Sequence, residues 1–250
     1  MMAPAGQPKL IVEADAEALA RAAAERAMVR IAANSGRIAI CLTGGSSPKK
    51  LYQLLGSAAW RGRIPWERVH WFIGDERFVP DSDPLNNMAV ARATFLDRHA
   101  PAGHIHPIPT TADNPDAAAE AYARELQAFY GGDQLDPARP LFDLVLMGAG
   151  PDGHTASLFP GYPEIEETRR WVVGVPKANV APFVPRVSLT LPALASCREM
   201  LFEIAGHDKR PILTRLCNGE NLPALRARSN GETVWLVDKA ALPEDIRGPR

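Results

Sequence analysis

Residues 142–161 read FDLVLMGAGPDGHTASLFPG, and this stretch indicates both how the chain folds and where it acts. The apolar run Leu144 to Met147 is typical of a buried strand, and it stops at a glycine-rich turn. That turn presents Asp152 and His154 two residues apart. Because histidine accepts and returns a proton near neutral pH, His154 is a candidate catalytic base. The alternative is a turn histidine that caps a short helix or satisfies a backbone group, and this stretch alone does not decide between the two.

Other apolar runs recur along the chain, with amphipathic segments between many of them. The expected strands are 9–12, 38–42, 69–73, 141–147, 171–175, 187–191, 201–204 and 234–237. Expected helices begin at Asp15 and near Pro48, and two more span 84–96 and 116–130. This alternation predicts an α/β fold with a mostly parallel sheet flanked by helices. We expect a single domain over residues 1–250, because no internal repeat or linker divides the chain.

Composition limits the classes of partner. The 250 residues are 46% hydrophobic and carry a formal net charge of -1. Such a chain can bury one substantial core but has no global basic field, so we expect neither nucleic acid nor an anionic membrane as a partner. An anionic ligand would have to be held by a local cluster of donors.

The cysteines and the apolar segments predict a cytoplasmic protein. Cys41, Cys197 and Cys217 are odd in number and show no CxxC spacing, so we expect buried thiols and neither a disulfide framework nor a zinc site. The first 35 residues lack the pattern of a secretory signal. No apolar run approaches the roughly 20 residues that a membrane-spanning helix needs.

Three of the predicted strands end in polar loops that contain glycine. These loops are GGSS at 44–47, GDER at 74–77 and GAGPDGH at 148–154. The carboxyl ends of parallel strands lie along one edge of a sheet, where ligands bind at a topological switch point. The sequence therefore predicts that the three loops meet around one ligand.

The first loop has the composition of a phosphate site. Gly44 and Gly45 allow the backbone to approach a ligand, Ser46 adds a hydroxyl donor, and the following helix directs free N–H groups toward it. The alternative is an ordinary turn in which a serine caps the helix. The loop is not a P-loop, because the GxxxxGK[ST] spacing is missing.

Charged residues follow other strands and could reach the same edge. In the second loop we expect at least one of Asp75, Glu76 and Arg77 to face the crevice, the alternative being a solvated turn. Arg186 precedes the strand at 187–191, and Lys209 follows the strand that ends at Ile204. Each of these two cations, taken alone, could equally be a surface charge.

Several other chemistries fit poorly. GAGPDG at 148–153 matches GxGxxG, but Pro151 and Asp152 interrupt the turn and no long helix follows, so a nicotinamide site is not expected. The chain has no GxSxG nucleophile elbow and no HExxH zinc motif. Asp75, Asp152 and His154 could gather a divalent ion, but one histidine with scattered carboxylates makes this a minor option.

These blocks together resemble the family that contains 6-phosphogluconolactonases and glucosamine-6-phosphate deaminases. The matching blocks are LTGGS at 42–46, GDER at 74–77, NN at 86–87, the stretch 148–161, RVSLT at 186–190 and GHDK at 206–209. The resemblance implies a Rossmann-like α/β domain with extra strands. The segment HTASLFPG is similar to the lactonase branch, because residues 155–159 lack the acidic residue of the deaminase branch. Ala149 stands where the family often has a larger apolar residue, and we expect the small side chain to alter packing more than chemistry.

The resemblance also implies an activity, the hydrolysis of a sugar-phosphate lactone without a metal or cofactor. It gives His154 the role of base, with Asp152 and Asp75 as further catalytic candidates. The implied phosphate-binding residues are Gly44, Gly45, Ser46, Arg77, Arg186 and Lys209. The implied partner is a small sugar phosphate, and we expect the protein to be a monomer or a weak homo-oligomer. Two alternatives stay open: a deaminase or isomerase with Asp75 as its base, and a non-catalytic sugar-phosphate sensor.

Overall fold

A computed structural model describes residues 7–244 of the chain. Its centre is a six-stranded sheet in the order β1-β9-β8-β5-β2-β3, and every pairing within it is parallel. The strands are β1 (Lys9–Glu13), β2 (Ile38–Leu42), β3 (Val69–Ile73), β5 (Leu144–Met147), β8 (Glu199–Ile204) and β9 (Glu232–Asp238). The predicted α/β fold with a mostly parallel sheet is confirmed. The chain runs outward from β2 to β3 and then returns to β5 on the other side of β2, which makes the β2–β5 boundary a switch point.

A second, antiparallel sheet has the order β4-β7-β6, with β4 (Asp75–Arg77), β6 (Val172–Val175) and β7 (Arg186–Leu189). The expectation of a loop at 74–77 was therefore wrong. The N–H of Gly74 still donates to the Leu42 carbonyl at 2.9 Å, whereas its own carbonyl accepts from the N–H of Leu189 at 2.8 Å. The chain thus passes from one sheet to the other at this glycine.

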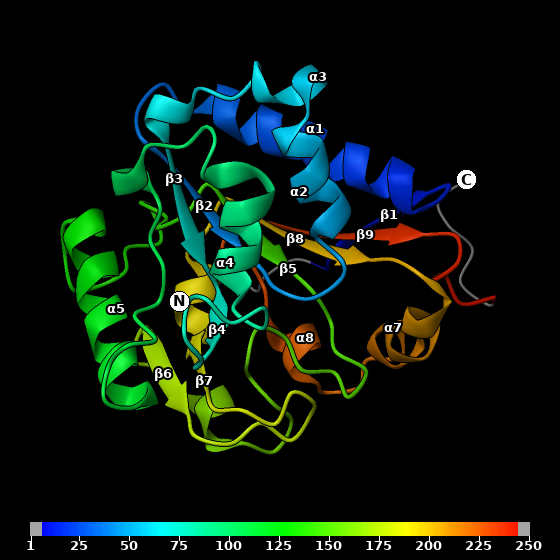
Figure 1. The fold of residues 1–250 in the computed structure, drawn as a ribbon. Coiled ribbons are helices and arrows are strands. Elements are labelled where there is room, and N and C mark those ends of the chain that lie inside the picture. The colour runs from blue at the N-terminus through cyan, green and yellow to red at the C-terminus, as the bar shows by residue number, and fades with distance from the viewer. Residues whose placement is uncertain (1–6, 245–250) are drawn as a thin grey trace.

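Helices cover the parallel sheet and the flank of the small sheet. They are α1 (Ala16–Ala33), α2 (Lys49–Gly56), α3 (Ala58–Arg61), α4 (Asn87–Ala91), α5 (Pro115–Tyr130), α6 (Leu191–Ala195), α7 (Arg210–Cys217) and α8 (Pro223–Arg226). Short 3₁₀ turns lie at Trp66–Arg68, Ala102–His104, Pro163–Glu166 and His207–Lys209. In Figure 1, α1, α2 and α3 lie together at the top, and α5 lies beside β6 and β7.

Capping residues explain where the two long helices begin. The side chain of Asp15 accepts from the N–H of Ala18 at 2.8 Å at the start of α1. Asn114 does the same for Ala117 at 2.9 Å, and Pro115 occupies the first turn of α5. Helix α5 ends at Tyr130, and the next residue, Gly131, caps it with a left-handed φ of 78°.

The helix expected at 84–96 begins later than predicted. Asn86 caps α4 by accepting from the N–H of Ala89 at 2.8 Å, so the helix starts at Asn87. Before it, the N–H of Leu85 donates to the Asp83 side chain at 2.8 Å and forms a turn. Beyond Ala91 the chain continues as a π-helical turn, Arg92–Leu96.

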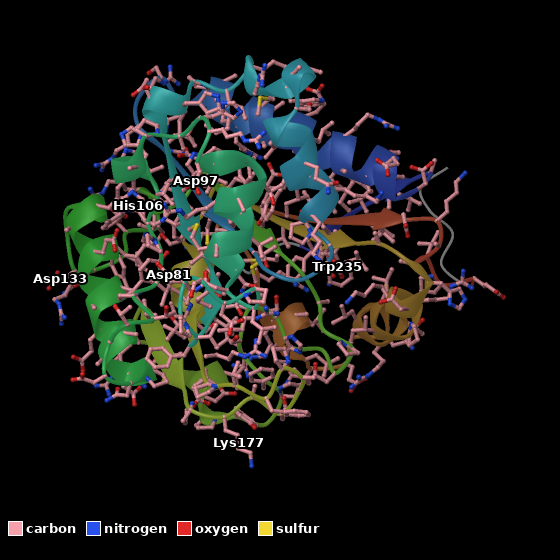
Figure 2. All side chains as sticks on the ribbon, in the orientation of Figure 1. Asp81, Asp97, His106, Asp133, Lys177 and Trp235 are labelled. Atoms are coloured by element: carbon pink, nitrogen blue, oxygen red, sulfur yellow. The ribbon has the colours of Figure 1, made fainter. Side chains whose placement is uncertain are left out.

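One large core cluster contains most of the buried hydrophobic residues, and all residues of β2 and β8 are buried. A second, small cluster consists of Phe159, Val175 and Ala178. Cys41 and Cys197 are buried as predicted, but Cys217 is exposed near the end of α7, which corrects the expectation for that thiol. Within residues 7–244, no helix combines the length and apolarity needed to cross a bilayer. The segment 176–185 forms an irregular loop, from which Lys177 projects outward (Figure 2).

Candidate active site

The three predicted polar segments meet at the carboxyl edge of the parallel sheet. They enclose a pocket of about 180 Å³. Its lining residues are Thr43, Gly44, Gly45, Ser46, Ser47, Asp75, Arg77, Asn87, Gly148, Ala149, Gly150, Pro151, His154, Ala156, Arg186 and Lys209. The structure thus brings every candidate phosphate-binding residue to one cavity, together with His154 and Asp75. Asp152 does not line the cavity, but it contacts His154, which does.

His154 and Asp152 form a hydrogen-bonded pair. Nδ1 of His154 lies 2.5 Å from Oδ1 of Asp152, and the two side chains are 20% and 27% exposed. Although partial burial of Asp152 opposes ionisation, the hydrogen bond and the nearby imidazole lower its pKa. A carboxylate at Nδ1 places the ring proton there, which leaves Nε2 as the basic nitrogen. The two residues are only two positions apart, yet they touch.

Gly150 makes room for the imidazole. A Cβ at this position would lie 2.0 Å from Cε1 of His154, closer than atoms can approach. The backbone closes the turn around the ring: the N–H of Gly150 donates to the His154 carbonyl at 2.8 Å, and that of Gly153 donates to the Gly150 carbonyl at 3.0 Å. The ring of Phe159 packs against the imidazole with centroids 5.0 Å apart. The ring is therefore held at the pocket wall.

Three cations line the same pocket. Arg186 is buried and donates to the carbonyls of Pro182 at 2.8 Å and Val184 at 3.2 Å. Lys209 donates to the Ala149 carbonyl at 2.9 Å, and Arg77 donates through Nη1 to the Leu85 carbonyl at 2.8 Å. Burial lowers the pKa of the Arg186 guanidinium from its usual value, while the charge of Asp75 opposes that effect. Backbone carbonyls fix all three side chains, and the cluster supplies the local positive charge that a phosphate would need.

The GGSS loop is held from behind by α2. The hydroxyl of Tyr52 donates to the Thr43 carbonyl at 2.7 Å and accepts from the Thr43 N–H at 3.1 Å. Gly45 has a φ of 88°, which is the left-handed region that suits glycine. Pro48 occupies the cap position of α2, and no side chain caps the helix. The alternative of a capping serine is therefore not what the structure shows.

The GDER segment is not a solvated turn, because Gly74, Asp75 and Glu76 are buried and Arg77 is half-buried. Oδ2 of Asp75 accepts from the hydroxyl of Ser157 at 2.7 Å. Glu76 accepts three backbone N–H bonds, from Arg77 at 2.8 Å, Asn87 at 2.7 Å and Met88 at 2.8 Å. Burial raises the pKa of Glu76 to about 7, although these hydrogen bonds oppose the shift. Glu76 therefore stays out of the pocket and ties β4 to the first turn of α4.

Sequence reasoning gave no role to Asn87, Ala156 and Ser157, which lie at or beside the pocket. Asn87 belongs to the NN block at 86–87, but a pair of polar residues before a helix more often only caps that helix. Ala156 has a φ of 48°, which few residues other than glycine adopt. Nothing local in HTASL announced that conformation. In the described part of the chain, no group of three or more His, Cys, Asp or Glu side chains is placed to hold a metal ion.

Comparisons with known proteins agree on one family. Residues 14–235 match the family described as glucosamine-6-phosphate isomerases/6-phosphogluconolactonase. The 6-phosphogluconolactonase of Streptomyces coelicolor is 38% identical, with 97% of each chain covered. That of Mycobacterium tuberculosis is 36% identical, covering 91% of this chain and 94% of the relative. The crystal structure of the Thermotoga maritima 6-phosphogluconolactonase superposes with a TM-score of 0.80 at 30% identity, covering 93% of this chain and all of that one.

Proposed function

The chain belongs to the glucosamine-6-phosphate isomerase/6-phosphogluconolactonase family and is a lactone hydrolase, and we propose that it converts 6-phosphoglucono-δ-lactone to 6-phosphogluconate with His154 as general base. One observation carries this proposal: a paired histidine and a cluster of three cations line the same small pocket. A base that faces an anion site matches a substrate that has a phosphate at one end and an ester at the other.

The cationic side of the pocket holds the phosphate. The backbone of the GGSS loop, Arg186 and Lys209 donate to its oxygens, and Arg77 adds a further positive charge. Binding this end of the substrate orients the ring, so that the C1 carbonyl lies beside His154. Orientation of this kind lowers the entropy cost of the reaction.

His154 then performs the proton transfers. Its neutral Nε2 takes a proton from a water molecule, and the water oxygen attacks C1. Backbone N–H groups of the glycine loops stabilise the resulting oxyanion. As the bond between C1 and the ring oxygen breaks, the imidazolium returns its proton to that oxygen. Ionised Asp152 stabilises the imidazolium between these steps. The products are a carboxylic acid and a free hydroxyl, and the histidine is regenerated.

Replacement of the base tests the mechanism. We expect His154→Gln to lower kcat by about 10²–10⁴-fold, which is the usual cost of losing a general base. The measurement is hydrolysis of freshly made lactone, corrected for the spontaneous reaction. His207→Gln is the matched control, because His207 is exposed and outside the pocket lining. Full activity in a correctly folded His154→Gln protein would remove His154 from this role.

Replacement of a cation tests the orientation of the substrate. We expect Lys209→Ala to raise KM while kcat changes much less, because the lost contact binds the phosphate before and during the reaction. Lys177→Ala is the control, since this lysine projects into solvent (Figure 2). An unchanged KM for Lys209→Ala would mean that the phosphate binds elsewhere.

The deaminase alternative has a direct test. Residues 155–159 provide no acidic side chain after the catalytic turn. We therefore expect no release of ammonia from glucosamine 6-phosphate under conditions in which the lactone is hydrolysed.

A further inference from the structure

Asp75 is an acid in a pocket that otherwise attracts anions. It is 6% exposed and lines the pocket together with three cations. Its Oδ2 accepts from the buried hydroxyl of Ser157, which orients the carboxylate. A carboxylate repels a phosphate over short distances, so the phosphate must lie away from Asp75. The part of the ligand that faces Asp75 must therefore carry hydrogen-bond donors.

Asn87 lies directly beside Asp75, with its amide fixed in place. Its Nδ2 donates to the backbone carbonyl of Asp75 at 3.1 Å, and its own N–H donates to Glu76 at 2.7 Å. The side-chain oxygen faces Gly44, where an added Cβ would lie 2.2 Å from it. Only a glycine at position 44 therefore allows the amide to sit against the loop. Asn87 also borders a neighbouring cavity of about 240 Å³, which shares Gly44 and Arg77 with the first pocket.

Contacts from two separate segments, the first turn of α4 and the residues after His154, hold this pair in place. Glu76 accepts from the N–H groups of Asn87 and Met88, so the first turn of α4 cannot move without breaking bonds to β4. Ser157 fixes Asp75 from the segment that follows His154. The carboxylate and the amide are thus set against the pocket before any ligand arrives, which is the preorganisation that selective recognition requires.

We propose that Asp75 and Asn87 form a hydroxyl-reading pair that selects lactones with free hydroxyl groups at C2, C3 or C4 of the ring. The proposal rests on the proposed function and assigns Asp75 to recognition of the substrate. A carboxylate accepts from a hydroxyl, and an amide both donates and accepts, so the two suit neighbouring hydroxyls. A site built to bond a hydroxyl discriminates strongly against analogues that lack it, because its polar groups are then left without partners.

The first test needs only the wild-type protein. The kcat/KM for 6-phosphoglucono-δ-lactone is compared with the values for its 2-deoxy, 3-deoxy and 4-deoxy forms, each made by oxidising the corresponding sugar phosphate. We expect at least one deoxy lactone to be hydrolysed more than about tenfold less efficiently. Losses below about tenfold for all three would overturn the pair and leave the lactonase function standing. No hydrolysis of the full substrate would overturn the proposed function itself.

Variants then assign the discrimination to the pair. In Asp75→Asn and Asn87→Ala we expect the ratio between the full and the deoxy substrate to fall toward one, chiefly through slower hydrolysis of the full substrate. Glu203→Gln is the matched control, since Glu203 is a buried acid outside the pocket lining and should leave the ratio unchanged. A ratio preserved in both pair variants would overturn the proposal. Calorimetric binding of 6-phosphogluconate and its deoxy counterparts to His154→Gln gives the same comparison without turnover.

Discussion

At the carboxyl edge of the parallel sheet the buried acids accept hydrogen bonds, whereas Glu203, inside β8, accepts none from residues 7–244. Glu76 is fully buried, and its three backbone donors partly offset that burial, so its pKa rises only to about 7. Glu203 is 1% exposed, and burial raises its pKa to about 8 with nothing to oppose it. The comparison shows that a buried glutamate can link two elements where backbone N–H groups donate to it. Where no donor is present, burial of its charged form destabilises the fold.

The largest expected effect comes from breaking the hydrogen bond between His154 and Asp152 at the carboxyl edge. Gly150→Ala would place a methyl group on the imidazole of His154 and force it away from Asp152. We expect kcat to fall by about 10²–10⁴-fold, as for loss of the base itself. Gly148→Ala is the matched control in the same turn, because a Cβ there meets nothing within 4 Å. Because Gly148 lines the pocket, we expect Gly148→Ala to raise KM and to change kcat little. Equal losses of kcat in the two variants would contradict this explanation.

Glu203 should make the free energy of unfolding depend on pH. The folded protein keeps the Glu203 proton up to about pH 8, whereas an unfolded chain releases it near 4.5. The protonated acid therefore stabilises the fold fully below pH 4.5, and this contribution is lost as pH rises through about 8. Between these limits we expect wild type to lose about 4 kcal/mol more unfolding free energy than Glu203→Gln.

Denaturant titrations of both proteins across that pH range measure the difference. Glu25→Gln is the control, since Glu25 lies on the surface and is paired with Arg63. Parallel stability curves for wild type and Glu203→Gln would show that Glu203 does have a partner in solution.

Glu76→Gln should show the smaller effect that its three hydrogen bonds predict. Its contribution follows the same sign but is lost as pH rises from 4.5 through about 7, so the pH-dependent difference from wild type should be about 1 kcal/mol smaller than for Glu203→Gln. In contrast to Glu203→Gln, this change should also lower kcat/KM, because Glu76 holds the turn that carries Asn87. If the two variants shared one pH profile and one level of activity, the comparison would fail.

Local patterns predicted most of the main sheet and the place of the site. Short apolar runs ended by glycine and polar residues located β2, β3 and β5 and the three segments that meet at the pocket. The antiparallel pairing of β4 with β7 could not be read in this way, because Asp75 and Ser188 lie far apart in the chain. The burial of Glu76 follows from that pairing, as does the inclusion of Arg186 in a strand. The roles of individual site residues stay predictions until variants are measured.

The sequence by itself determined which segments become strands and which side chains are available for proton transfer and anion binding, since hydrophobic periodicity and turn chemistry are local properties. Only the tertiary structure decided which polar groups meet. Elements that are distant in the chain bring Asp75 to Ser157 and Asn87 to Gly44. They also surround Glu203 without giving it a hydrogen-bond donor from residues 7–244. Burial and hydrogen bonding then set the charge of each acid, because both are properties of the packed environment and not of the residue.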